Sequence, residues 1–151
     1  MELRIKKTHP NATIPFKATD GSAGLDLSAA LDETVTIHPG EVKSISTGIA
    51  IELPEKNMVA LMISRSSLAQ KFGISLANSV GVIDSDYRGT ISMVLRNQSS
   101  EPFVIENGDR LVQLLITSVI PLNIVEANEL SITERDTGGF GSTGTNKTLN
   151  T

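Results

Sequence analysis

The feature that most constrains the fold is a series of short segments in which apolar and polar residues alternate between turn-forming residues. Residues 34–37, the turn 38–41 and residues 42–53 form one strand, turn, strand unit. A second unit covers residues 103–116 around an Asn-Gly pair, which is a strong hairpin signal. Alternation with a period of two is typical of half-buried strands. The sequence therefore predicts an all-β fold with hairpins at both places.

Further short strands are expected at residues 58–63, 74–77 and 90–96. Residues 66–72 alone resemble a helix, barely two turns long, with a serine placed to cap its N-terminus. Many short strands at near-regular spacing favour a sandwich, a jelly roll or a barrel. Because the apolar periodicity fades after about residue 128, we expect a β domain over residues 1–130 and a C-terminal arm over residues 131–151.

The composition limits the classes of function. A chain of 151 residues has the size of one domain with a real core. The formal net charge of -4 argues against a large electrostatic nucleic-acid surface, and no apolar run approaches the length of a membrane span. The absence of cysteine excludes disulfides, thiolate metal sites and a cysteine nucleophile. We expect a cytoplasmic protein without direct nucleic-acid or membrane binding.

Residues 81–89, GVIDSDYRG, place two carboxylates, the only tyrosine and an arginine between two glycines. This composition suits a tight β-hairpin whose tip displays polar groups. One interpretation is an ordinary turn in which the aspartates bind backbone N–H groups. The other is a pocket in which one carboxylate orients a nucleophilic water. The residues of this stretch favour neither interpretation.

Residues 64–67, SRSS, end an apolar strand and open the expected helix. A helix N-terminus offers free N–H groups, and one cation and two hydroxyls beside it make a small anion site that suits phosphate. The alternative is that the serines only cap the helix and Arg65 is a surface charge.

Two polar residues lie within apolar strands. Asp26 stands between leucines in AGLDL and is either an exposed edge residue or the partner of a metal-bound water. Gln113, in GDRLVQL, needs a hydrogen-bond partner if it is buried, and a phosphate oxygen or a neighbouring backbone group would serve. The glycine-rich residues 135–144, RDTGGFGSTG, lack the Gly-Lys-Ser/Thr of a P-loop, and the two histidines give little support to a metal site or a catalytic triad.

The order and spacing of these stretches are more specific than any one of them. The succession AGLDL, SRSS, GVIDSDYRG, GDRLVQL and RDTGGFGSTG resembles the five ordered motifs of the homotrimeric deoxyuridine triphosphate nucleotidohydrolases, the dUTPases, over about residues 20–144. The resemblance implies a jelly-roll-like distorted β-barrel with one short helix and a flexible C-terminal arm. It further implies a homotrimer whose active sites are shared between subunits.

The resemblance also implies an activity, the Mg²⁺-assisted hydrolysis of dUTP to dUMP and pyrophosphate, which keeps uracil out of DNA and supplies dUMP for thymidylate synthesis. Asp84 would hold the water that attacks the α-phosphorus, Tyr87 would pack under the deoxyribose, and Asn78 would pair with uracil. Asp26 would contact Mg²⁺ through water. The other substrate-binding residues that the motifs imply are Arg65, Ser66, Ser67 and Gln113 at the phosphates, Val80, Gly81 and Ile83 beside the uracil, and Arg135, Phe140, Gly141, Ser142 and Thr143 in the arm.

Three positions depart from the family pattern. Ser64 stands where proline is usual, Ser67 where glycine is also common, and Asp136 replaces a usual glycine beside the expected phosphate contacts. Two other functions compete with the dUTPase interpretation. A dCTP deaminase would share the fold and the ligand type but lacks an arm of this kind. A protein of another class, a non-catalytic β-sandwich module or a nucleotide-gated interaction partner, stays open, as does a regulatory protein partner.

Overall fold

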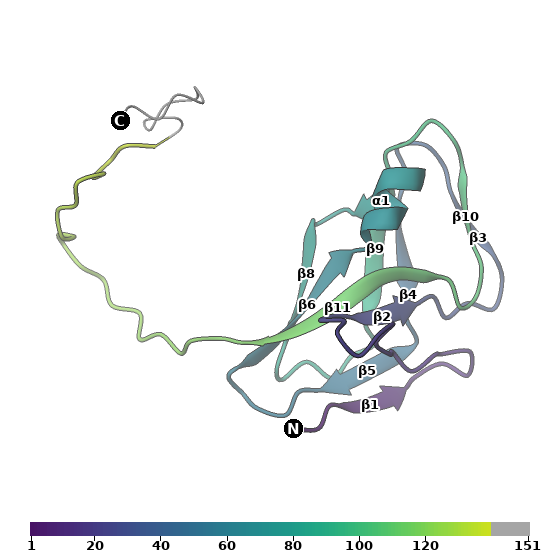
Figure 1. Cartoon of the computed structure of the whole chain (residues 1–151), viewed down its shortest axis with the longest axis horizontal. Helices are drawn as coiled ribbons and strands as arrows, with labels where there is room; N and C mark the ends of the chain where they lie inside the picture. Colours follow the sequence, from purple (N-terminus) through teal and green to yellow (C-terminus); the bar gives the residue numbers. More distant parts are fainter. Residues whose placement is uncertain (140–151) are drawn as a thin grey trace. The chain divides into compact units, whose positions relative to one another are not determined.

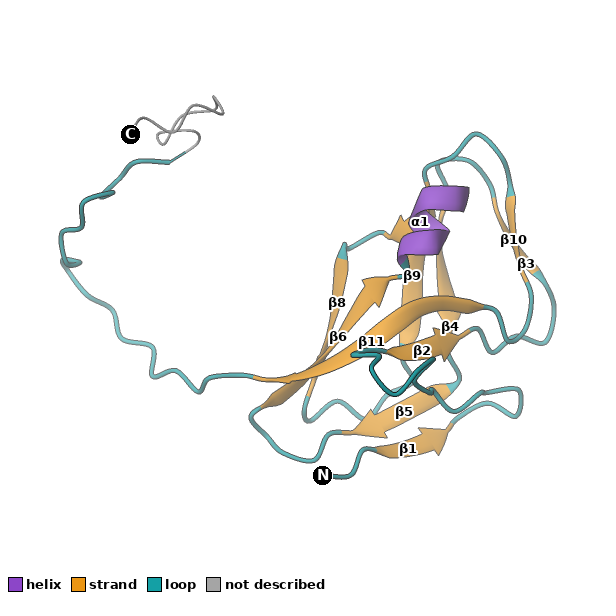
Figure 2. Ribbon diagram, in the orientation of Figure 1, coloured by secondary structure: helices purple, strands orange, loops and turns teal. Residues whose placement is uncertain are grey.

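The computed structural model describes residues 1–139, and the chain divides into two units, Met1–Pro121 and Leu122–Thr151. The first unit is built from strands and one short helix (Figure 1, Figure 2), which confirms the predicted all-β class. In chain order the elements are β1 (Arg4–Lys7), β2 (Leu25–Ser28), β3 (Val35–Ile37), β4 (Val42–Ser46), β5 (Ile49–Glu52), β6 (Met58–Ser64), α1 (Ser66–Phe72), β7 (Ile74–Leu76), β8 (Val80–Asp84), β9 (Ser92–Asn97), β10 (Phe103–Ile105) and β11 (Arg110–Ser118). In the second unit, residues 122–139 contain neither helix nor strand.

The strands of the first unit form four antiparallel sheets. The largest has the order β2-β11-β6-β8, and a three-stranded sheet has the order β4-β9-β7. Two pairs, β1-β5 and β3-β10, complete the arrangement. Across residues 1–139 these strands do not close into one continuous barrel, so the jelly-roll-like architecture is an open one. The single helix of this part has seven residues, far fewer than a membrane crossing requires.

The predicted hairpins are wrong, although the strands themselves exist. β3 pairs with β10, in the register Phe103↔Ile37, while β4 pairs with β9. β11 pairs with β2 and β6 instead of β10. Turns do occur at 38–41 and 106–109, and they carry the chain from one sheet to another. The turn residues therefore predicted the turns correctly but not the strands that pair. The expected strand at 42–53 is also divided, because Gly48 adopts a φ of 65° between β4 and β5.

Helix α1 begins and ends where the sequence predicted, but a serine does not cap it. The N-cap residue is Arg65, whose side chain makes no capping hydrogen bond, and Gly73 ends the helix in the left-handed conformation with a φ of 64°. The Ser64 hydroxyl instead accepts a hydrogen bond of 2.9 Å from the Leu76 amide. Ser64 thus ties the end of β6 to β7.

The core between the sheets is aliphatic. Its largest fully buried side chains are Leu27, Ile37, Ile45, Ile49, Ile74, Met93, Leu95, Ile105, Leu111, Leu114 and Val112, and the polar Asn97 is buried among them. The Asn97 side chain has a partner for each of its polar atoms. Its amide donates to the carbonyls of Ile37 at 2.9 Å and Glu101 at 2.7 Å, and its carbonyl accepts from the backbone and the hydroxyl of Ser99. Asn97 therefore joins β9 to β3 and to the loop before β10.

We expect Asn97→Ala to lower the free energy of unfolding by about 2–4 kcal/mol, because the truncation leaves buried carbonyl and amide groups without partners. Chemical unfolding at one fixed protein concentration measures the change. Gln98→Ala is the matched control, since Gln98 is exposed and its side chain makes one hydrogen bond, to the Ser75 hydroxyl. Equal stability of the two variants would contradict the structural role of Asn97.

Candidate functional site

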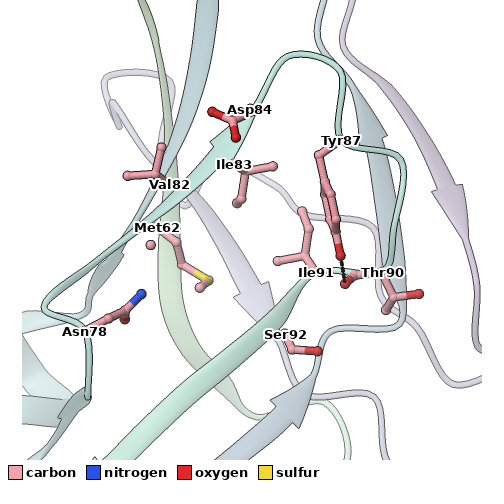
Figure 3. Close-up of a pocket in the computed structure, with 10 residues that line it drawn as sticks. Met62, Asn78, Val82, Ile83, Asp84, Tyr87, Thr90, Ile91 and Ser92 are labelled. Atoms are coloured by element: carbon pink, nitrogen blue, oxygen red, sulfur yellow. Dashed lines mark hydrogen bonds between the residues drawn. The ribbon is translucent and has the colours of Figure 1, made fainter.

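A pocket of about 300 Å³ lies along β8 and the loop that follows it, and we call it the Asp84 pocket (Figure 3). Its lining comes from β6, the turn before β8, β8 itself and residues 87–92. The lining residues are Met62, Asn78, Gly81, Val82, Ile83, Asp84, Tyr87, Thr90, Ile91 and Ser92. The mixture of apolar and polar side chains suits a ligand with a ring and hydrogen-bonding edges.

Strand β8 presents Asp84 through simple alternation. Its burial pattern places Gly81 and Ile83 inward, while Val80, Val82 and Asp84 face outward. The predicted hairpin over residues 81–89 is wrong, because β8 pairs with β6 and the next strand, β9, belongs to another sheet. Within residues 1–139 the Asp84 carboxylate makes no hydrogen bond or ion pair. A carboxylate in that state can accept a hydrogen bond from a water in the pocket.

Tyr87 is held at the wall of this pocket by its hydroxyl. The hydroxyl donates a 3.1 Å hydrogen bond to the Thr90 carbonyl (Figure 3), and the ring stays half exposed. Gly89 makes this pose available, since a Cβ at residue 89 would collide with the hydroxyl and the ring carbon that bears it. The adjacent Arg88 guanidinium donates to the carbonyls of Ser85 and Tyr87 and fixes the loop from outside.

The other end of the Asp84 pocket is a turn that carries Asn78. Ser79 adopts a φ of 63° there, and the amide of Val80 donates 2.7 Å to the Asn78 carbonyl. Gly81 is buried, and a Cβ on it would lie 2.8 Å from Cε of Met62. A side chain at residue 81 would therefore fill the floor between Met62 and Asn78.

A second pocket, of about 310 Å³, lies where β2, β11 and the start of α1 meet, and we call it the Arg65 pocket. It is lined by Ala18, Ser22, Ala23, Gly24, Asp26, Arg65, Ser66, Ser67 and Gln113. The approach of Gln113 requires glycine at residue 24, since a Cβ there would lie 2.8 Å from Oε1 of Gln113. Hydroxyls, an amide and a guanidinium converge here, which suits an anion.

Asp26 is the centre of a cluster with two arginines. Its side chain is only 10% exposed; Oδ1 lies 3.4 Å from Nε of Arg65 and Oδ2 lies 3.0 Å from Nη1 of Arg110. The alternative that Asp26 is an exposed edge residue is therefore wrong, and Arg65 is a paired side chain, not an isolated surface charge. Arg110 was absent from the sequence-based site residues. One indication was present in the sequence, the position of Arg110 within GDRLVQL. Simple alternation, however, puts Arg110 and Gln113 on opposite faces of the strand.

The structure gathers most of the predicted site residues into these two pockets. Asn78, Gly81, Ile83, Asp84 and Tyr87 meet in the first, and Asp26, Arg65, Ser66, Ser67 and Gln113 meet in the second. Val80 is exposed on β8 and lines neither pocket. Arg135 lies in the second unit, where Nε donates 2.9 Å to the Gly138 carbonyl. The predicted arm residues Phe140, Gly141, Ser142 and Thr143 lie outside the described residues.

The backbone at Asp136 adopts a conformation in which glycine is the most favourable residue. Asp136 adopts a φ of 42°, in the left-handed region that favours glycine and that aspartate tolerates better than most residues. Its amide donates 3.0 Å to the Thr133 hydroxyl. The substitution thus keeps the turn and adds one negative charge.

Comparison with known proteins identifies a family. Residues 10–144 match the dUTPase family model. A deoxyuridine 5'-triphosphate nucleotidohydrolase of Desulfitobacterium hafniense is 51% identical over 131 residues, which are 87% of each chain. The dUTPase of Staphylococcus bacteriophage 80alpha with dUPNHPP superimposes with a TM-score of 0.87 at 27% identity, over 95% of this chain and 99% of that one. A mutant dUTPase from phage phi11 of S. aureus, described as coordinating a structural Mg(II) ion, has a TM-score of 0.77 at 25% identity, over 85% and 98%.

Gly89→Ala is expected to displace Tyr87, because the added methyl occupies the space of the tyrosine hydroxyl. The chain has one tyrosine and no tryptophan, so its intrinsic fluorescence reports Tyr87 alone. We expect acrylamide to quench the variant more strongly than the original protein. Gly21→Ala is the control, since a Cβ at residue 21 meets nothing within 4 Å. Identical quenching in both variants would show that Gly89 does not position the ring.

Proposed function

This chain belongs to the dUTPase family, and from that membership we propose that its two pockets form one dUTP-hydrolysing site contributed by different copies of the chain. The chain is about half identical, over most of its length, to relatives named deoxyuridine 5'-triphosphate nucleotidohydrolase. This identity assigns it the activity of a dUTP diphosphatase. The products are dUMP and pyrophosphate.

The observation that carries the proposal is the separation of the pockets. In the order β2-β11-β6-β8, Asp84 belongs to one edge strand and Asp26 to the other. Three strand spacings, about 14 Å, lie between those edges. The carboxylate that would orient the water and the groups that would bind the phosphates therefore line different pockets of one subunit, and assembly would bring one subunit's Asp84 pocket to another's Arg65 pocket.

Exposed valines on β8 and β9 support assembly with other copies of the chain, whose number, three, is what the dUTPase resemblance implies. Val80, Val82 and Val94 leave 42%, 63% and 37% of their surface accessible. β8 is an edge strand, and apolar side chains on an unprotected edge are suited to burial against another chain.

We assign to Asp84 the task of orienting and deprotonating a water. The water oxygen forms a bond to the α-phosphorus, the bond from that phosphorus to the oxygen bridging the α- and β-phosphates breaks, and pyrophosphate leaves with the bonding electrons. The proton of the water passes to the carboxylate. The exposed carboxylate at the end of β8, with no partner among residues 1–139, supports this assignment.

Tyr87 and the turn around Asn78 would bind the nucleoside. The tyrosine ring is fixed through the Thr90 carbonyl, so it forms a rigid surface against the deoxyribose, where a ribose 2'-hydroxyl would clash. The Asn78 amide and the backbone of residues 80–83 offer donors and acceptors to the uracil edge. The Arg65 pocket would bind the phosphates through Arg65, Ser66, Ser67 and Gln113.

The residues present fit Mg²⁺ only as an ion that arrives with the nucleotide. Among the described residues no group of three or more His, Cys, Asp or Glu side chains could hold a metal. Asp26 is the one carboxylate of the Arg65 pocket, and both its oxygens face guanidinium groups, so contact through a water suits it better than direct ligation. Bound to the phosphates, Mg²⁺ neutralises their charge.

The C-terminal arm over residues 131–151 is proposed to close over the nucleotide, with Phe140 on the uracil and Arg135, Gly141, Ser142 and Thr143 at the phosphates. Phage dUTPases are described as controlling transfer of virulence genes by a proto-oncogenic G protein-like mechanism, which leaves a regulatory protein partner open for this chain. The cytoplasmic location stays a prediction.

A hydrolysis assay with dUTP and Mg²⁺, run beside dTTP, dCTP and UTP, tests the function. We expect pyrophosphate from dUTP and little from the other three nucleotides. Loss of ammonia from dCTP with dUTP intact would assign the chain to the deaminases instead.

Asp84→Asn is expected to lower kcat by about 10²- to 10⁴-fold, because the amide cannot accept the proton of the water. Affinity for dUpNHpp, the imido analogue of dUTP, should change little, as the substitution removes almost no volume. Asp86→Asn serves as the control, being an exposed aspartate two residues away. Steady-state kinetics of both variants decide the role: near-normal turnover of Asp84→Asn would assign the base elsewhere.

Ending the chain after Thr133 should leave a folded trimer with a rate reduced at least about tenfold, because closure excludes water and adds phosphate contacts. Size-exclusion chromatography with light scattering measures assembly, and the dUTP assay measures the rate. A truncated chain that unfolds would make the arm a structural element.

A further inference from the structure

We propose that Arg110 is a positioning residue for phosphate recognition, an inference that rests on the proposed function of the Arg65 pocket. Arg110 is not among the residues that line this pocket. Its side chain is 43% exposed and contacts Asp26, with Nη1 3.0 Å from Oδ2 of that residue and the guanidinium 5.9 Å from the centre of the Phe16 ring. Its effect on a ligand would therefore act through Asp26 and Arg65.

A bulge in β11 turns Arg110 toward this cluster. Opposite β2, Gln113 pairs with Asp26 and Val112 with Leu27, but Ser28 pairs with Arg110 instead of Leu111. This extra residue reverses the alternation, so Arg110 joins Gln113 on the face of Asp26 while Leu111 is buried in the core. A regular strand would point Arg110 to the opposite face. The bulge thus aims a third charged side chain at the cluster.

The guanidinium of Arg65 is held at two points. Its Nε faces Oδ1 of Asp26 at 3.4 Å, and its Nη1 donates 3.0 Å to the backbone carbonyl of Arg110. Residue 110 therefore holds Arg65 twice, directly through its carbonyl and indirectly through Asp26. The guanidinium of Arg65 is planar, so two fixed points define the direction of its remaining N–H groups.

The charge of the cluster also depends on Arg110. Among the residues that line the Arg65 pocket, the charged ones are Asp26 and Arg65, and their formal charges cancel. With Arg110 as a second counterion of Asp26, the three-residue cluster has a net formal charge of +1. Because both guanidinium groups share the single carboxylate of Asp26, that carboxylate cannot neutralise both of them. A positive potential therefore remains for an incoming phosphate chain.

Binding of dUpNHpp and of dUMP, both with Mg²⁺ present, to the full-length protein tests the proposal. We expect Arg110→Gln to weaken binding of dUpNHpp by about tenfold or more, the effect of losing one charge-assisted contact, and binding of dUMP by less than about twofold. Arg110→Lys, which keeps the charge without the planar fork, should fall between the original protein and Arg110→Gln. Arg96→Gln, the same change at an exposed residue of β9, should bind both ligands normally.

A double variant shows whether Arg110 acts through Asp26. Added to Asp26→Asn, Arg110→Gln should cause less further loss of dUpNHpp affinity than it causes alone, because its partner charge is already gone. Fully additive losses, or equal losses for dUMP and dUpNHpp, would overturn the proposal. If Arg110→Gln does not fold, Arg110→Lys decides the same question. A wild-type protein that fails to hydrolyse dUTP would refute the proposed function, whereas an active one with unchanged Arg110 variants would refute only this inference.

Discussion

The pairing of β11 with both β2 and β6 is the constraint on which the rest of the molecule depends. It places the strand in the middle of the largest sheet and buries Leu111, Val112 and Leu114 in the core. It also fixes which strands are edges, and so which surfaces remain for ligands and for other copies of the chain. These contacts join residues far apart in sequence, such as Asp26 and Gln113, so the sheet cannot form from local segments alone.

Sequence patterns predicted the features that depend on residues close together in the chain. The all-β class, the helix at 66–72 and most strand positions followed from alternation, turn residues and length. The pairing did not follow, because a turn such as the one at 106–109 brings two strands close in the chain whether or not they bond to each other. In this fold β10 and β11 each pair with strands distant in sequence, not with each other.

The candidate site likewise contains residues that the sequence predicted and one residue that only the structure revealed. Ordered motifs identified Asp84, Tyr87, Arg65 and Gln113, and the structure collects them into two pockets. Arg110 was missed because a bulge cannot be read from alternation, and one extra residue moves a side chain to the other face. The predicted serine cap failed because Arg65 occupies the N-cap position of α1 and makes no side-chain capping hydrogen bond.

The placement of Asp84 and Asp26 on opposite edge strands has a consequence for how such an enzyme is controlled. In the proposed shared site one subunit supplies only part of the residues, so it would be inert by itself and catalysis would be a property of the assembly. Activity would then fall more steeply than protein concentration on dilution, and freshly made chains would stay silent until they find partners. Mixing subunits whose substitutions lie in different pockets would also restore some activity, because a mixed assembly would contain intact sites.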